Sequence, residues 1–413
     1  MASVNDSAFA PVVALDLSRS AAAAAAAHDF AARRLPAYVE RLATLVDIDS
    51  AADCPEGRER VAELLAEWAT AAGCFCESVP TPGGPHLVAR LPGVGGPRIA
   101  LLGHHDTVFP RGTAAARPFS RADGRAFGPG VADMKGGLLL ALLALEALAE
   151  GERPFAALEL HSAPDEEIRT TSLPALPLVR GAAAALVFEC GRENGDVVVG
   201  RKAGAWVRLS ATGRPAHAGT EPELGRNAVL ALCRELLRGD GLNGGRPGLT
   251  VIAGTIAGGT MANVVPEHAE AIVDVRAETS DDLRWALGRL ADVASDDGVR
   301  VDVAVDGPWP GIEPNAGTAT MFAAARSLAA GLGFAVGGQT SGGVSDGCWT
   351  SADAVPTIDG LGPVGGLDHS ADEYILLDSI APRCGLAAGL CDAIGRGLLD
   401  GRLAEGGGPT GRV

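Results

Sequence analysis

The order of strand-like and helix-like segments is the feature that most restricts the fold of this chain. Short apolar runs of the kind buried in parallel sheets alternate with segments whose apolar residues recur at helical spacing. The strand-like runs are 87–91, 98–103, 156–161, 183–188 and 355–361, and the helix-like segments are 35–46, 58–72, 136–150, 317–332 and 379–399. This alternation predicts an α/β domain built on a doubly wound, mostly parallel sheet.

A different order of elements interrupts this pattern after residue 202. The interruption contains an expected strand at 205–211, a helix at 226–238, strands at 249–256 and 268–276, a helix at 280–295 and a strand at 299–305. The order β-α-β-β-α-β is that of a ferredoxin-like α+β domain, which folds as a unit. We therefore predict that residues 1–202 and 313–413 form the α/β domain and that residues 203–312 are inserted into it. Residues 1–30, which include an alanine run, are predicted to be an N-terminal extension.

Charge and cysteine content narrow the partners and the compartment. The 413 residues include 51 acidic and 34 basic side chains, for a net charge of −17. Such a field repels phosphate backbones and anionic lipid surfaces, so we expect neither a nucleic acid nor a membrane as partner. The eight cysteines form no C-x-x-C pair, and we see no targeting segment and no run of roughly 20 apolar residues that could span a membrane. A cytoplasmic location is therefore expected.

Histidine and acidic residues recur just after the predicted strands. His104 and Asp106 follow the strand at 98–103, and Glu189 closes the strand at 183–188. Because ligands of open α/β sheets bind outside the carboxyl ends of the strands, these side chains are expected to meet at one edge. The other members of the set are Asp165, Glu166 and Glu167 after the strand at 156–161, His369 after the strand at 355–361, and Asp133 in the glycine-rich segment 128–137.

These residue types are those of a zinc site, in which imidazole nitrogens and carboxylate oxygens bind the metal and no thiolate is needed. Two histidines and three carboxylates suit two ions that share one bridging carboxylate, with a water between them. Paired ions roughly 3.5–4 Å apart generate a hydroxide nucleophile and stabilise the developing oxyanion. A carboxylate beyond the ligand set can then take the proton from the water as general base.

Five motifs also resemble those of a known enzyme family. They are GHHDTV at 103–108, GPGVADMKGG at 128–137, APDEE at 163–167, FEC at 188–190 and GGLDHSADEY at 365–374. In this order they resemble the dinuclear zinc peptidases and amidohydrolases that include glutamate carboxypeptidase, aminoacylase-1, acetylornithine deacetylase and succinyl-diaminopimelate desuccinylase. The resemblance extends from about residue 35 to residue 400 and includes the inserted domain.

The resemblance implies a role for each residue of the set. His104 and Glu189 would bind one ion, Glu167 and His369 the other, and Asp133 would bridge the two. Glu166 would be the general base. Asp106 would not bind an ion itself but would contact His104 and orient its ring. The ions would be two divalent metals per chain, Zn²⁺ first, with Co²⁺ or Mn²⁺ as alternatives. The resemblance also implies a cis peptide between Asp133 and Met134.

The resemblance further implies the reaction and the work of the inserted domain. We expect metal-dependent hydrolysis of an amide bond to an amino acid with a free carboxylate, by a glutamate-carboxypeptidase-like peptidase or an N-acyl-amino-acid amidohydrolase. The substrate would be an N-acyl amino acid, with acyl-glutamate first, or a short peptide. The inserted domain would act as a lid and join two chains in a homodimer. Its Arg276, His217 and Asn263 match residues that bind substrate in the family.

Arg276 has an alternative interpretation that the sequence leaves open. It ends an apolar strand, which favours an anionic partner because a charged residue is seldom buried without one. That partner could be the substrate carboxylate, as the resemblance implies, or it could be a neighbour in the chain. In the second case Arg276 would form a surface salt bridge with Asp274 or Glu278.

Two other functions need to be weighed. Residues 343–347 match the nucleophile elbow G-x-S-x-G, with Ser345 as nucleophile and His369 after it. The flanking segments GGQTSGGV and CWTSADAVP supply neither the strong strand before the serine nor the helix after it. A non-catalytic relative that binds metal or a partner protein would lack a ligand or the base, and none is missing here.

One departure from the family is Arg169, where a glycine is usual. His105 is expected either to lie behind the metal ligands or to face solvent.

Overall fold

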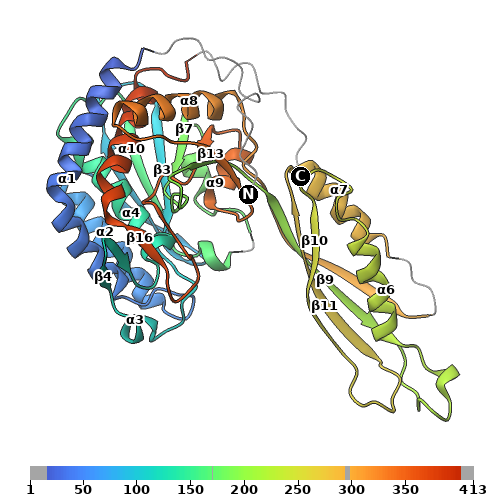
Figure 1. Cartoon of the computed structure of the whole chain (residues 1–413). Coiled ribbons are helices and arrows are strands. Elements are labelled where there is room, and N and C mark those ends of the chain that lie inside the picture. The colour runs from blue at the N-terminus through green and yellow to red at the C-terminus, as the bar shows by residue number, and fades with distance from the viewer. Residues whose placement is uncertain (1–15, 170, 294–297, 401–413) are drawn as a thin grey trace. The chain divides into compact units, whose positions relative to one another are not determined.

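The structure is a computed structural model, and it describes residues 16–169, 171–293 and 298–400 (Figure 1). Contacts divide these residues into two compact units. The first contains the described residues up to Gly200, Pro314–Ser341, and those from Ser345 onward; the second contains Arg201–Glu313 and Gly342–Val344. Each unit has a hydrophobic core of its own.

The first unit is built on a six-stranded sheet in the order β1-β2-β6-β3-β7-β14. The strands are β1 (Phe75–Thr81), β2 (Gly84–Pro92), β3 (Arg98–His104), β6 (Ala157–Ala163), β7 (Ala184–Val187) and β14 (Thr357–Ile358). The four strands β6, β3, β7 and β14 run parallel, whereas β1 and β2 form an antiparallel hairpin at one edge. The mostly parallel α/β sheet is therefore confirmed.

One expectation about this sheet is wrong. The run at 87–91 was expected to lie in a parallel part of the sheet, but β2 pairs antiparallel with both of its neighbours. A buried apolar run shows that a strand has neighbours, and it carries no information about their direction. β1 was not expected at all, because its side chains are largely exposed and show no apolar pattern.

Helices cover both faces of the sheet, as in a doubly wound fold. One face packs against α2 (Pro55–Ala71), α4 (Gly136–Ala149) and α10 (Ile380–Gly395), and α1 (Ser18–Val46) packs on α4 and α10 in the same large core. The other face packs against α9 (Asp346–Ala352) and α5 (Leu176–Val179). α8 (Ala316–Gly331) contacts α10 and β14. Helices α1 and α10 lie side by side in Figure 1, so the two ends of the described chain share one core.

α1 begins well before the helix that the sequence predicted. Its alanine run is helical, and the alanines that face α10 are buried, so this part of the expected N-terminal extension belongs to the core. Residues 1–15 of that extension lie outside the described residues.

Smaller elements complete the first unit. Short strands β15 (Gly365–Gly366), β16 (Tyr374–Leu376), β5 (Arg125–Phe127) and β4 (Ser120–Ala122) form a second sheet, and β13 (Gly338–Ser341) pairs with β8 (Val197–Arg201). α3 spans Thr113–Ala116. His369 lies in the loop between β15 and β16, one connection later than expected, because β14 ends at Ile358 and β15 intervenes.

The second unit has the ferredoxin-like order of elements. β9 (Ala203–Thr212), β10 (Thr250–Gly258), β11 (His268–Ala277) and β12 (Arg300–Trp309) form an antiparallel sheet in the order β10-β11-β9-β12. Helices α6 (Ala228–Asp240) and α7 (Ser280–Ala291) contact the same strands β9 and β11 and bury alternate side chains of the sheet (Figure 1). The opposite face of the sheet carries exposed side chains such as Trp206 and Ile272.

No helix among the described residues is both long enough and apolar enough to cross a membrane.

Candidate metal centre

His104 is the last residue of β3, and its ring is held from one side by Asp106. Its Nδ1 lies 3.1 Å from the backbone oxygen of Asp106 and 3.2 Å from the Oδ1 atom of the same residue. Both side chains are buried. Because Nδ1 faces Asp106, the Nε2 atom of His104 is left to face the centre of the site.

Asp133 lies at that centre, in the turn η2 (Val131–Lys135) that precedes α4. Its Oδ1 atom is 3.0 Å from Nε2 of His104, and its Oδ2 atom is 3.1 Å from Nε2 of His369. The two carboxylate oxygens therefore face two different imidazoles, as a bridging carboxylate would. The peptide bond between Asp133 and Met134 is cis, as the resemblance implied.

Glu189 and Glu167 complete two groups around Asp133. Glu189 follows β7, and its Oε1 atom lies 3.7 Å from Nε2 of His104. The Oε2 atom of Glu167 lies 3.4 Å from Nε2 of His369. The possible ligand atoms of each group lie within 4.8 Å of one another, and the two groups are His104, Asp133 and Glu189, and Asp133, Glu167 and His369. The structure thus brings together all five residues that the sequence proposed as ligands.

Glu166 and Glu167 are neighbours in the short turn η3 (Glu166–Ile168), but they are placed differently. Asp106 accepts the backbone N–H of both residues at 3.0 Å, so the same carboxylate that holds His104 also fixes this turn. The side chain of Glu167 reaches His369. Within the described residues, no hydrogen bond or ion pair occupies the carboxylate of Glu166, which leaves it available to a substrate or a water.

The carboxylates of the site repel one another and are shielded from water. Burial, with smaller contributions from neighbouring carboxylates, raises the pKa of Glu166 to about 7. Burial likewise raises the pKa of Glu189 well above its usual value. Hydrogen bonds to Asp133 and Glu167 raise the pKa of His369 to about 11. A cluster of this kind binds extra positive charge, either as protons or as cations.

The donor set fits divalent ions. Oε1 of Glu167 is buried and finds no hydrogen-bond partner within the described part of the chain, although it lies beside the Asp133 group. A buried acceptor without a donor is costly, and a cation would satisfy it. Carboxylate oxygens and imidazole nitrogens, with no thiolate, are ligands that zinc, cobalt and manganese accept.

Ser345 has no arrangement suited to a nucleophile. Its hydroxyl donates to Oδ2 of Asp359 at 2.7 Å and accepts the backbone N–H of Gly347, and the residue caps the short helix α9 in an extended conformation. A short helix does follow Ser345, so the expectation from the segment CWTSADAVP that none would follow is wrong. A nucleophile elbow would in addition hold the serine in a strained turn beside a histidine. The hydroxyl of Ser345 instead serves the fold.

Two residues near the site behave in ways that the sequence did not determine. Arg169 is buried and forms ion pairs with Asp165, at 2.6 Å, and with Asp346, so its charge is used inside the protein. His105 is fully buried and lies 2.8 Å from the hydroxyl of Ser162, which rules out the solvent-facing alternative.

Glu373 was missed by the sequence interpretation. It is buried and binds the Asp133 segment. The only signal available was its place in the GGLDHSADEY motif.

The three residues of the second unit that were expected to bind substrate, Arg276, His217 and Asn263, have different hydrogen-bond and ion-pair partners. Arg276 forms an ion pair with Asp274, whose Oδ2 atom lies 2.8 Å from Nη2, so the salt bridge that the sequence left open is present. His217 is exposed, and its Nδ1 accepts the backbone N–H groups of Gly219 and Thr220 at 3.2 and 3.0 Å. The backbone oxygen of Asn263 accepts from Ala218, which ties the His217 and Asn263 segments together.

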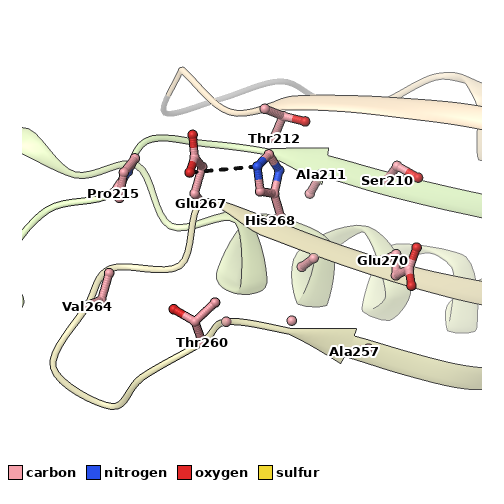
Figure 2. Close-up of a pocket in the computed structure, with 13 residues that line it drawn as sticks. Ser210, Ala211, Thr212, Pro215, Ala257, Thr260, Val264, Glu267, His268 and Glu270 are labelled. Carbon is pink, nitrogen blue, oxygen red and sulfur yellow. Dashed lines mark ion pairs between the residues drawn. The ribbon is translucent and has the colours of Figure 1, made fainter.

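A hollow of about 460 Å³ lies elsewhere in the second unit and includes none of these three residues. Figure 2 shows residues that line it, among which Glu267 and His268 form an ion pair at 3.7 Å. Both side chains are well exposed, so the pair is a surface feature.

Residues 100–393 match the sequence family described as Peptidase family M20/M25/M40. The chain belongs to this family. It is 28% identical to Carboxypeptidase G2 of Pseudomonas sp. over 376 residues, which cover 88% of this chain and 90% of that relative. It is 32% identical to a Succinyl-diaminopimelate desuccinylase of Alkalilimnicola ehrlichii over 342 residues, 76% of this chain and 88% of the relative.

Solved structures agree on the fold of this M20 chain. The aminopeptidase PepT of Bacillus cereus superposes with a TM-score of 0.73 at 23% identity, covering 87% of this chain and 98% of that one. The M20 metallo-carboxypeptidase Sso-CP2 of Sulfolobus solfataricus gives 0.70 at 16% identity, covering 87% and 99%. Family membership makes this M20 chain a metal-dependent enzyme that hydrolyses amide bonds with divalent ions, and it gives no support to a binding protein or a serine hydrolase.

Proposed function

We propose that the enzyme hydrolyses the amide bond of an N-acyl amino acid or short peptide whose amino-acid half keeps a free carboxylate. Acyl-glutamate is the first candidate. Support comes from the two relatives above, whose names describe a carboxypeptidase and the removal of a succinyl group from an amino-acid compound. The motif order and the geometry of the Asp133 groups support the same reaction class.

Five side chains would hold two divalent ions, with Zn²⁺ preferred and Co²⁺ or Mn²⁺ as alternatives. His104 and Glu189 would bind one ion, Glu167 and His369 the other, and Asp133 one oxygen to each. When bound, such a pair lowers the pKa of water and polarises the scissile carbonyl. Asp106 would keep His104 in the tautomer that presents Nε2 to an ion.

Glu166 would move the protons of the reaction. Its carboxylate takes one proton from the attacking water while the water oxygen bonds to the carbonyl carbon. When the C–N bond breaks, the same group returns that proton to the nitrogen of the leaving amine. The absence of a partner for this carboxylate among the described residues, beside a Glu167 engaged with His369, supports this division of roles.

The observation that carries the proposal is the placement of Asp133 between two imidazoles, one on each oxygen. The test is metal analysis of the purified enzyme together with a hydrolysis screen over N-acyl amino acids and dipeptides, each also offered with an amidated carboxyl end. We expect close to two ions per chain, loss of activity on chelation and restoration by added metal. Full amidase activity at negligible metal content would overturn the proposal.

In the inserted domain, Arg276, His217 and Asn263 are proposed to bind the substrate. The Nε and Nη2 atoms of Arg276 are engaged with Asp274, so a substrate carboxylate would have to share the guanidinium. His217, unlike Arg276, has a donor atom that is available to a substrate. Because its Nδ1 accepts two backbone N–H groups, Nε2 carries the proton and can donate it to a substrate oxygen.

We also propose that residues 203–312 form a lid and dimerisation domain, and that the enzyme is a cytoplasmic homodimer. Strand β10 is an edge strand that pairs only with β11 among the described residues, and it exposes Ile252 and Ile256. The neighbouring helix α6 exposes Leu230 and Leu237, the latter 73% accessible. An apolar edge of this kind is protected when a second copy pairs with it. All eight cysteines are free, which suits a reducing compartment.

Light scattering of the purified enzyme tests the dimer. Replacing Ile256 and Leu237 together by lysine should shift the mass from two chains to one. The same pair of changes at Val94 and Phe75, which are exposed on the first unit, is the control and should leave the dimer intact. A monomeric wild-type enzyme would refute the dimer without touching the proposed reaction.

A further inference from the structure

The carboxylate of Glu373 is buried against the backbone of the segment that carries Asp133. Its Oε1 atom accepts the N–H groups of Ala132 and Asp133 at 2.7 and 2.9 Å, and its Oε2 atom accepts that of Gly130 at 3.1 Å. The residue is 1% exposed. Three backbone donors on one carboxylate is a specific arrangement, because Oε1 has to face two donors and Oε2 a third at the same time.

No ion pair occupies this carboxylate within the described residues. The buried Lys135 feels the charge of Glu373, but it donates its Nζ to the backbone oxygen of Ile48 at 2.7 Å. The ion pairs that surround other buried acids, such as those of Arg90 and Arg98 with Glu159, are absent at Glu373. The carboxylate is therefore held by the Gly130–Asp133 backbone, and that backbone is held by the carboxylate.

The contact joins two parts of the site that are distant in sequence. Glu373 lies four residues after His369, immediately before β16, whereas Asp133 precedes α4. Asp133 also has to serve two imidazoles at once, at 3.0 and 3.1 Å. A backbone shift at Asp133 would lengthen at least one of these distances, and Glu373 bonds directly to the backbone N–H of that residue.

We propose that Glu373 is a positioning residue that fixes the Gly130–Asp133 backbone so that Asp133 can present one oxygen to each of two divalent ions. This inference rests on the proposed function, since the position of Asp133 matters in this way only if it bridges two ions. Glu373 belongs to neither of the two groups of possible metal ligands found among the described residues. It acts through the backbone of Asp133. His369 lies on the same segment as Glu373.

The test is metal affinity, measured on the full chain without substrate. Glu373→Gln keeps the size of the side chain but turns one acceptor oxygen into an N–H₂ donor that faces a backbone donor. The loss of an outer partner of this kind typically weakens metal binding about 10–100-fold, and we expect that loss in a competition titration of the metal-free protein with Zn²⁺. In the Co²⁺-loaded protein the visible absorption bands should also change, because the geometry at Asp133 changes.

The matched control is Asp372→Asn, which removes a carboxylate one residue away. Asp372 is exposed, and within the described residues its carboxylate accepts no hydrogen bond from the Gly130–Asp133 backbone, so Zn²⁺ affinity and the Co²⁺ spectrum should stay as in the wild type. If Glu373→Gln does not fold, Glu373→Asp is measured instead. It keeps the charge but is one methylene shorter, and an affinity between those of the wild type and a tenfold loss is expected.

Two results separate the possible failures. Wild-type affinity and an unchanged Co²⁺ spectrum in a folded Glu373 variant would overturn this inference and leave the proposed function standing. A wild-type protein that binds no divalent ion would refute the proposed function itself, before any variant is compared.

Discussion

The two units of the molecule use charged side chains in opposite ways. Around Asp133 in the first unit, four carboxylates lie close to the buried ring of His104 and the half-exposed ring of His369, and burial raises the pKa of Glu166 to about 7. In the second unit the most interesting cation, Arg276, is neutralised by Asp274 two residues earlier in the same strand. The first arrangement is incomplete without added positive charge, whereas the second is complete within the protein.

The difference shows how a site can be distinguished from a structural ion pair. A structural pair satisfies its charges locally, and the exposed ones contribute little. A site keeps a buried atom such as Oε1 of Glu167 without a hydrogen-bond partner in the described residues, at a cost in stability that a bound ligand recovers. The first unit also contains a structural arrangement of this kind, because Arg169 forms ion pairs with Asp165 and Asp346.

The largest expected effect is that of Glu166→Gln. The amide keeps the shape of the side chain but cannot take a proton, so kcat should fall roughly 10²–10⁴-fold while metal content stays that of the wild type. Steady-state kinetics and metal analysis on the same samples check this. Glu167→Gln is the neighbouring control, because it should loosen one ion instead. If the two variants exchanged these phenotypes, the base and the ligand would have to be exchanged as well.

Arg169→Met should cause the next largest effect, on stability. It leaves the carboxylates of Asp165 and Asp346 buried without their cation, which typically costs about 3–5 kcal/mol in the free energy of unfolding. Arg208→Met in the second unit is the matched control, since its pair with Asp306 is exposed and contributes at most about 1 kcal/mol. Urea unfolding of both variants provides the measurement. Equal losses would show that burial does not separate the two kinds of ion pair.

Arg276→Ala asks whether the second unit also contains a site. If the guanidinium is shared with the substrate carboxylate, kcat/KM should fall about tenfold for acid substrates, a loss of about 1.4 kcal/mol, and should not change for their amidated analogues. Arg208→Ala, on the same sheet, should change neither. Equal losses on acid and amidated substrates would mean that the Arg276–Asp274 pair only supports the fold, and the anchoring role would be dropped.

The smallest effect concerns pH. His86 is buried in the first unit, 3.3 Å from His161, and burial together with the neighbouring His161 lowers its pKa well below the usual value. The unfolded chain binds a proton at this histidine below about pH 6.5, whereas the folded chain does not. The neutral ring therefore supports stability above that pH, and the support is lost as pH falls, by at most about 1.4 kcal/mol for each pH unit.

His86→Gln should flatten this dependence, as measured by urea unfolding at pH 7.5, 6.5 and 5.5. His268→Gln, at a well-exposed position of the second unit, is the matched surface control. An unchanged pH dependence in the His86 variant would show that this histidine is not a source of acid sensitivity.

Much of the fold could be predicted from the sequence because periodicity records burial. The fully apolar stretch that becomes α4 and the β-α-β-β-α-β order of the second unit are visible without coordinates, as are the strands that end at the site. What periodicity omits is direction and partner, so the antiparallel placement of β2 and the weakly patterned edge strand β1 were found only in the structure.

The candidate site was also predictable from the sequence only in part. The sequence by itself determined which residue types could bind metal and, through the order of the motifs, which five positions to expect, because ligand chemistry is a property of the side chains themselves. Only the tertiary structure decided the partners: Asp133 faces His104 with one oxygen and His369 with the other, and Glu373 holds its backbone. It also decided that Arg169 and Arg276 already have carboxylates beside them. A charge in a sequence has no fixed partner until folding sets its distances, and electrostatic interaction depends on those distances and on burial.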